Sequence, residues 1–197
     1  MMTSLTCRAR AKHHTNRGCA KSRLRRRALT TPSATKHVTC RFLDLSSDED
    51  CTMVGALLNE YASDAMGGAT PLAPDVVRTV GAKLNEVPGA MSVAAFDENC
   101  VPVGLCNSLM GFSTFKALPL CNIHDVYVKP SHRGCGIAPQ MLKLIEEEAR
   151  ARGCCKLTLE VLSNNESAKT SYEKYGFQAY ELDPDAGQAL FWEKALR

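Results

Sequence analysis

The residues of this sequence best suited to chemistry form a short glycine-rich segment with the features of an anion site. Arg133, Gly134 and Gly136 follow a run with strand character at residues 126–128 and precede apolar residues at helical spacing. The glycines let the backbone turn sharply and approach a ligand closely. A helix that begins here directs its unpaired N–H groups and the positive end of its dipole at that ligand. The segment therefore predicts a phosphate or pyrophosphate site.

Two common phosphate-binding patterns do not fit this segment. No Gly-Lys-Ser/Thr follows the glycines, so the lysine and the magnesium-binding hydroxyl of a P-loop are missing. The third glycine of the dinucleotide-binding pattern would fall at Pro139. What remains is Arg133-x-x-Gly136-x-Ala138, which resembles the acetyl-CoA pyrophosphate loop of the GNAT superfamily of N-acetyltransferases.

A second motif downstream strengthens the resemblance. The string from Asn165 to Phe177 is similar to the GNAT segment usually written NxxAxxLYEKxGF, and it departs from that pattern at Ser171, where the family prefers Leu. Glu160 lies twelve residues before Tyr172, a spacing similar to that of the Glu and Tyr pair in ribosomal-protein alanine N-acetyltransferases. The resemblance covers residues 38–197.

The elements expected from the sequence follow the order that GNAT proteins have. The resemblance implies the fold class α/β (α+β), with a splayed mixed sheet of about seven strands flanked by about four helices. The turn at residues 97–99 predicts a hairpin, and acidic residues after Ser47 predict a helix start. Strands are expected at 37–45, 90–96, 101–110, 123–128, 156–161, 177–182 and 189–193, and helices at 47–66, 75–87, 137–149 and 166–175.

The resemblance implies an acetyl-CoA site where the sheet opens between its fourth and fifth strands. The pantetheine arm would pair with backbone groups of Val126 and Val128 like an added strand. The pyrophosphate would accept hydrogen bonds from the loop, and the Arg133 side chain would add charge. The residues implied in cofactor binding are Val126, Val128, Arg133, Gly134, Cys135, Gly136, Ile137, Ala138, Asn165 and Tyr172.

The resemblance also implies the catalytic groups. Tyr172 occupies the position of the general acid that protonates the CoA thiolate, and a backbone N–H near Val126 would stabilise the oxyanion. Glu160 and His124 compete for the role of base. His124 matches one of two active-site histidines of arylalkylamine N-acetyltransferases. Its ordinary pKa suits a base at pH 7, although a structural role stays open for each of the three residues.

Strand alternation adds an expectation about faces. If the strand at 123–128 is regular, Asn122, His124 and Val126 share one face and Asp125 points to the other. A covalent acetyl intermediate on Cys106 or Cys121 is a further route, but neither thiol has a recognisable base and orienting group in the sequence. None of the ten cysteines forms a CxxC pair or a zinc-ligand pattern, so no metal is expected.

The expected function is transfer of an acetyl group from acetyl-CoA to a primary amine by direct transfer in a ternary complex. The acceptor is a small molecule or a peptide amine, expected to enter opposite the CoA over residues 66–74 and 111–115. The alternative is a GNAT-fold module that binds acyl-CoA as a sensor without transfer. No apolar stretch predicts a membrane span. Nucleic acid is not expected as a partner because no aromatic residue precedes Phe42, and a homodimer stays open.

The N-terminal segment differs in charge from the rest of the chain. Residues 1–43 contain eleven Lys/Arg and no acid, whereas the rest contains thirteen Lys/Arg against 21 acids, a net charge of −8. Residues 1–37 are therefore expected to form a basic, disordered tail similar to an organelle transit peptide, ahead of a GNAT domain at 38–197. The predicted location is a plastid or mitochondrion, with the cytoplasm as the alternative.

Overall fold

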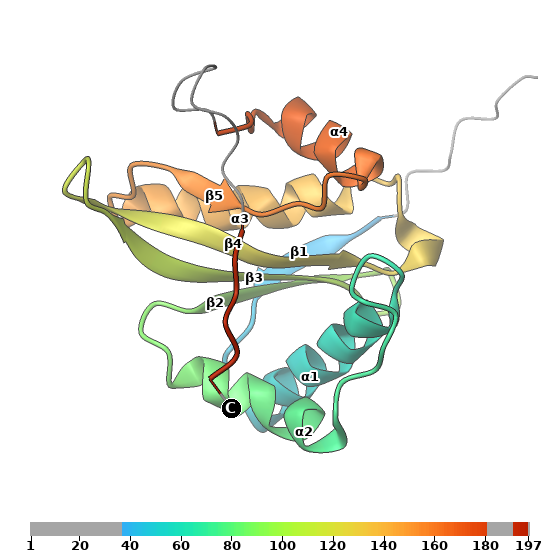
Figure 1. Cartoon of the computed structure of the whole chain (residues 1–197). Coiled ribbons are helices and arrows are strands. Elements are labelled where there is room, and N and C mark those ends of the chain that lie inside the picture. Colours follow the sequence, from blue (N-terminus) through green and yellow to red (C-terminus); the bar gives the residue numbers. More distant parts are fainter. Residues whose placement is uncertain (1–36, 181–190, 197) are drawn as a thin grey trace, which may run out of the picture. The chain divides into compact units, whose positions relative to one another are not determined.

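The computed structural model describes residues 37–180 and 191–196 (Figure 1). The predicted transit-peptide tail therefore lies outside the described residues, apart from His37, and its boundary stays a prediction. The elements are β1 (Thr39–Phe42), α1 (Asp48–Ser63), α2 (Pro74–Asn85), β2 (Met91–Phe96), β3 (Pro102–Ser113), β4 (Leu118–Val128), the 3-10 turn η1 (Pro130–His132), α3 (Ile137–Ala151), β5 (Leu157–Leu159) and α4 (Glu166–Tyr175).

The strands form one mixed sheet in the order β1-β2-β3-β4-β5. Strands β1 to β4 pair antiparallel with one another in chain order, whereas β5 runs parallel to β4. The predicted hairpin between β2 and β3 is confirmed. Its turn is held by the carboxylate of Asp97, which accepts hydrogen bonds from the backbone N–H groups of Asn99 and Val101, both at 2.9 Å.

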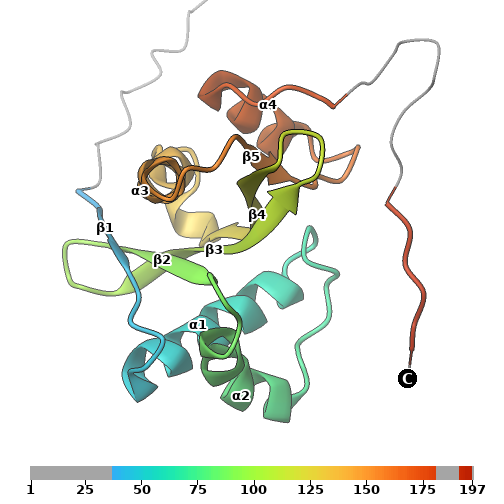
Figure 2. The ribbon, with the colours of Figure 1, turned by 90° about the vertical axis from the view of Figure 1, so that its left-hand side faces the viewer.

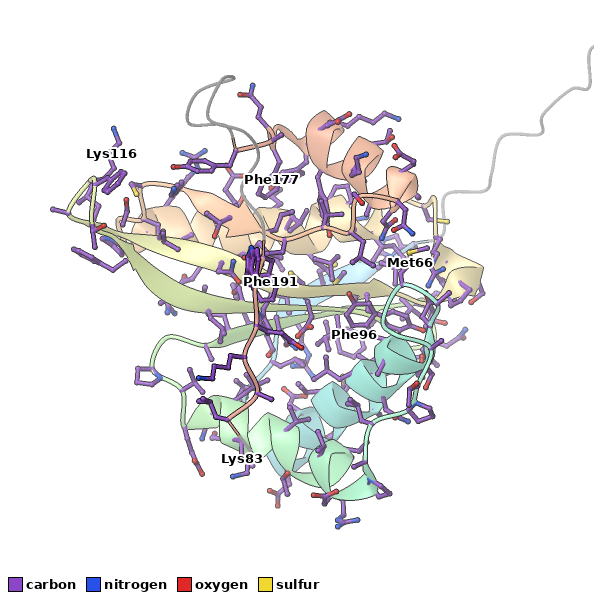
Figure 3. All side chains as sticks on the ribbon, in the orientation of Figure 1. Met66, Lys83, Phe96, Lys116, Phe177 and Phe191 are labelled. Atoms are coloured by element: carbon purple, nitrogen blue, oxygen red, sulfur yellow. The ribbon has the colours of Figure 1, made fainter. Side chains whose placement is uncertain are left out.

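Helices cover both faces of the sheet. Helices α1 and α2 lie on one face and α3 and α4 on the other (Figures 1 and 2). Each face has its own apolar cluster: Phe96 belongs to the α1 side, and Phe177 to the α3 side (Figure 3). The α3-side cluster includes Val93, Val103, Cys106, Cys121, Ile123, Ile137, Met141, Leu142 and Ile145, and the α1-side cluster includes Leu43, Val54, Leu57, Ala94, Leu105 and Tyr127.

The two predicted C-terminal strands are wrong over the described residues. Residues 177–180 and 191–196 contain no strand, so the described part of the sheet has five strands instead of about seven. The side chains of residues 178–180 are exposed, and Phe191 and Trp192 are each more than 80% exposed. A strand needs a buried face to fix its register, and among residues 177–180 and 191–196 only Phe177 is partly buried.

Within residues 37–180 and 191–196, no helix is both long enough and apolar enough to cross a membrane.

Candidate active site

The sheet opens between β4 and β5, as predicted. The two strands pair only where Cys121–Ile123 lies beside Leu157–Leu159. Over the next five residues, 124–128, β4 stays paired with β3 but has no strand on its other side in the described part of the chain. An unpaired parallel edge within a sheet leaves backbone donors and acceptors free for an extended ligand.

Backbone groups of Val126 and Val128 point to this open edge. The N–H of Lys129 donates to the carbonyl of Val103 on β3 at 2.9 Å, so the alternate residues of β4 direct their N–H and C=O groups away from β3. The carbonyl of Val128 accordingly accepts a hydrogen bond from the Nε of Arg133, at 3.0 Å, on the open side. These are the groups that sequence analysis assigned to the pantetheine arm.

The glycine-rich loop leads from this edge into α3. Gly134 (φ 76°) and Gly136 (φ 72°) adopt the left-handed conformation that glycine allows without strain. An added Cβ at either glycine would meet nothing within 4 Å, so the space over the loop is open. The N–H groups of Gly134, Cys135 and Gly136 make no hydrogen bond within the described residues, and Ile137 and Ala138 form the first helical turn. The loop thus presents a set of unpaired donors.

Arg133 makes contacts that its sequence motif did not predict. Its guanidinium pairs with Asp64, the residue that ends α1, with 2.7 Å between the Nη2 and Oδ2 atoms. This hydrogen bond is the main reason that the pKa of Asp64 is lowered, and the N–H of Met66 adds to it. One arginine therefore bridges the open strand edge, the glycine loop and the connection between α1 and α2.

Tyr172 projects from α4 against the α3-side cluster. Its ring meets the edge of Phe177 at a centroid distance of 5.8 Å. Burial, with smaller contributions from Cys106 and Tyr61, raises the pKa of Tyr172 to about 12, so the phenol is protonated at neutral pH. The hydroxyl has no hydrogen-bond partner within residues 37–180 and 191–196. At neutral pH this side chain therefore carries a proton that no described neighbour accepts.

The helix that positions Tyr172 has a signal at each end. The side chain of Asn165 accepts a hydrogen bond from the N–H of Ala168 at 3.2 Å, which is an N-cap, and Gly176 ends the helix with φ 112°. The predicted C-cap at Gly176 is confirmed. Asn165 has a capping role in this structure, and its contact with the cofactor stays a prediction.

Glu160 lies just beyond β5 and is held by a neighbour across the sheet. The side-chain amide of Asn122 lies 3.3 and 3.4 Å from the two carboxylate oxygens of Glu160 and 3.2 Å from the hydroxyl of Thr158. The Glu160 side chain is otherwise exposed. An amide donor therefore orients the carboxylate beside the point where β4 and β5 separate.

The expected alternation of β4 is wrong at His124. Ile123 pairs with Ser108 and Asp125 with Asn107, so His124 is an extra residue, a β-bulge. The bulge reverses the faces that follow it. Val126 packs on the α3-side cluster with Ile123, whereas Asp125 comes to the same face as Asn122. His124 is exposed and has no hydrogen bond or ion pair in the described structure.

The two cysteines considered as nucleophiles are buried. Cys106 and Cys121 are both fully inaccessible to solvent. Burial is the largest cause that raises the pKa of each thiol, and Asp125 adds to the effect at Cys106. A nucleophilic cysteine needs a stabilised thiolate, and neither residue has one.

Three further observations concern the rest of the described structure. Residues 111–113 extend β3, and Phe115, in the turn between β3 and β4, is 88% exposed; the next residue, Lys116, is labelled in Figure 3. A cavity of about 490 Å³ lies between the end of β1, the α2–β2 connection and the last turn of α3. It includes none of the predicted site residues. No group of three or more metal-ligating side chains occurs among the described residues.

Sequence reasoning missed Asn122 as the partner of Glu160 and placed Asp125 on the wrong face. The bulge has no local sequence signal, because it depends on the register between two strands. One signal was available: Ser92 and Asn107 are polar residues within largely buried strands, and Asn107 joins Ser92 to Asp125.

Comparisons with known proteins agree with the geometry. The family described as the acetyltransferase (GNAT) family matches residues 55–177. The acetyltransferase Atu2258 of Agrobacterium fabrum is 41% identical over 69 residues, covering 34% of this chain and 49% of that protein. The thialysine N-epsilon-acetyltransferase of Bos taurus is 38% identical over 79 residues, covering 40% of this chain and 45% of that protein. The chain thus spans about half the length of these curated relatives.

A solved structure shows the same fold over more of the chain. The ribosomal-protein-alanine N-acetyltransferase of Brucella melitensis biovar Abortus 2308 superimposes with a TM-score of 0.58 and 21% identity. The match covers 82% of this chain and 99% of that protein.

Proposed function

We propose that this chain, which belongs to the acetyltransferase (GNAT) family, transfers an acetyl group from acetyl-CoA to a primary amine. The observation that supports this most strongly is the open edge of β4, which leads directly into a loop of unpaired N–H groups at the start of α3. The names of the curated relatives, an acetyltransferase and a thialysine N-epsilon-acetyltransferase, are consistent with amine acetylation.

The residues present fit acetyl-CoA, which supplies a thioester-activated acetyl group when bound. Val126 and Val128 offer backbone groups on the open edge, as an extended amide-containing arm requires. The N–H groups of residues 134–138 suit a pyrophosphate. The guanidinium of Arg133 belongs to the same loop, where a phosphate would compete with Asp64 for it.

The proton transfers are assigned to two side chains, Glu160 just beyond β5 and Tyr172 on α4. Glu160, oriented by Asn122, takes the proton of the attacking amine. Tyr172 is protonated at neutral pH and has its hydroxyl free, so it gives a proton to the sulfur that leaves. A base oriented by a third group is the usual arrangement in acyl transfer, and this favours Glu160 over His124, which no neighbour orients.

We further propose that the basic N-terminal segment directs the chain to a plastid or mitochondrion. Its support is the charge pattern of the sequence, eleven Lys/Arg and no acid in residues 1–43.

The test is mass spectrometry of products after the full chain is incubated with acetyl-CoA and pooled small amines and peptides. We expect an acetylated amine whose yield falls about a hundredfold in Tyr172→Phe, the usual effect of losing a general acid. Tyr175→Phe is the matched control on the same helix. Its hydroxyl donates to Glu146 at 2.7 Å, so this variant should lose about 1 kcal/mol of stability but keep the rate. Binding of CoA without product from any pool would favour the sensor.

A further inference from the structure

Three polar side chains form a row across the middle of the sheet. Ser92 on β2 faces Asn107 on β3, and Asn107 faces Asp125 on β4, each as a direct cross-strand partner. The hydroxyl of Ser92 donates to the Oδ1 of Asn107 at 2.7 Å, and the Nδ2 of Asn107 donates to the Oδ2 of Asp125 at 3.0 Å. The row leads from the interior of the protein to the strand that borders the opening.

This row is unusual in its surroundings. Ser92 and Asn107 are each 2% exposed; Ser92 lies between Met91 and Val93, and Asn107 lies between Cys106 and the buried Ser108. Buried polar groups add little stability compared with apolar residues of the same size, and each must be hydrogen-bonded to avoid a penalty. The hydrogen bond from Ser92 to the amide oxygen of Asn107 fixes the orientation of that amide. Its NH₂ group therefore points at Asp125 and donates to it. The row therefore fixes the position of one carboxylate.

The carboxylate of Asp125 faces the α1 side of the sheet. The β-bulge at His124 puts it on the same face as Tyr127, whose ring contacts that of Tyr61 on α1 at a centroid distance of 5.9 Å. The charge of Asp125 also adds, after burial, to the raised pKa of Tyr61. Asp125 immediately precedes Val126, whose backbone borders the proposed acetyl-CoA arm. An amine that approaches from the α1 side would meet this carboxylate.

Among the residues that the structure describes, two acids on α1 and at its C-cap are neutralised by cations, whereas Asp125 is not. Glu60 pairs with Lys129 at 3.1 Å, and Asp64 pairs with Arg133 at 2.7 Å. Asp125 receives only the neutral amide of Asn107 within the described residues. A partly buried carboxylate without a cation is the complement of an ammonium group.

We infer that Asp125 binds the ammonium form of the acceptor amine, and that Asn107 is the positioning residue which holds Asp125 for it. The inference rests on the proposed function and narrows it to cationic amines: alkylamines, including lysine-like side chains, in preference to amines that are neutral at pH 7. Asp125 recognises the cation, whereas Glu160 remains the group that takes its proton.

The test compares two acceptors of the full chain, n-butylamine, which is an ammonium ion at pH 7, and aniline, which is neutral. We expect Asp125→Asn to raise KM for butylamine about ten- to a hundredfold, as loss of a charged hydrogen bond predicts, and to leave kcat/KM for aniline unchanged. Asn107→Leu should give the same selective increase, and Ser92→Ala a smaller one. Glu60→Gln is the matched control, because it removes an ion-paired carboxylate on the α1 side of the sheet. It should leave KM for butylamine and kcat/KM for aniline unchanged.

The outcomes separate this inference from the proposed function. Equal losses for both acceptors, or no loss for butylamine, would overturn the role of Asp125. So would a wild-type enzyme that acetylates aniline but not butylamine. No product from any amine or peptide would instead count against the proposed function. If Asn107→Leu fails to fold in thermal unfolding, Asp125→Asn and Ser92→Ala decide the result.

If the wild type acetylates only butylamine or a different amine, competitive inhibition replaces the comparison of two acceptors. Choline and its uncharged carbon isostere are then compared as competitive inhibitors. Asp125→Asn should weaken inhibition by choline about tenfold or more and leave the isostere unchanged, because only the cation interacts with the carboxylate. Equal inhibition of the wild type by both compounds would overturn the inference.

Discussion

The side-chain amide of Asn122 lies within 3.4 Å of both carboxylate oxygens of Glu160, across the last residues at which β4 and β5 pair. This contact joins residues 38 positions apart in the sequence and orients the carboxylate at the opening of the sheet. It gives Glu160 the support that a general base needs, whereas His124 on the bulge has none.

Replacing Glu160 should therefore abolish the acid limb of the pH–rate profile. We expect Glu160→Gln to lower kcat about a hundredfold or more, which is typical of losing a general base. Asn122→Ala should lower kcat about tenfold and keep the acid limb, because the base remains but is less well oriented. His124→Gln should change neither kcat nor the acid limb of the pH–rate profile. An acid limb that survives in Glu160→Gln and disappears in His124→Gln would reverse the assignment.

Arg133 should determine the affinity for acetyl-CoA. We expect Arg133→Gln to raise KM for acetyl-CoA about tenfold, since a charged contact to phosphate is lost, with little change in kcat. Asp64→Asn removes the competing partner of Arg133 and should lower that KM or leave it unchanged. Arg152→Gln serves as the control, because Arg152 pairs with Glu148 at the far end of α3. An unchanged KM in Arg133→Gln would exclude the pyrophosphate role.

The ion pair between Arg41 and Asp50 should make stability depend on acid pH. Arg41 donates to both oxygens of the buried Asp50 carboxylate, at 2.7 Å each, and this is the largest cause of the lowered pKa of Asp50. Because the pKa is lower in the folded state, the contribution is full above the ordinary value of 3.8 and is lost as pH falls through the lowered value. Urea unfolding should show Asp50→Asn less stable by about 2 kcal/mol at pH 7, and the difference should shrink below pH 4.

Asp48→Asn is the matched control for that measurement. Asp48 lies in the same first turn of α1 but makes no side-chain ion pair within the described residues, so only a few tenths of a kcal/mol are expected from the helix dipole. If both variants lose the same stability, the Arg41 pair is not the cause.

The basic N-terminal segment should be absent from the mature protein. Cleavage is expected near residues 35–40, around the start of β1, and N-terminal sequencing of the protein isolated from cells measures it directly. Recovery of the chain with its first residues intact, outside any organelle, would contradict the targeting proposal.

The local features of the site could be predicted from the sequence because short stretches of backbone encode them. Gly134 and Gly136 adopt the left-handed conformation that their motif implies, and α3 begins immediately after them. Asn165 and Gly176 cap α4 and so place Tyr172. Each of these signals acts over a few residues, through the freedom of glycine and the hydrogen bonds of helix ends.

Only the tertiary structure decided which side chains meet. The bulge at His124 moved Asp125 to the face of α1, and the pairing of distant strands brought Ser92, Asn107 and Asp125 into one row. The bond from Arg133 to Asp64 spans 69 positions of the sequence. A shift of one residue in strand register exchanges the two faces of a strand, and register depends on partners far away in the chain. The sequence by itself thus determined the family, the glycine loop and the helix that presents Tyr172, and the folded sheet determined which side chains surround the opening between β4 and β5.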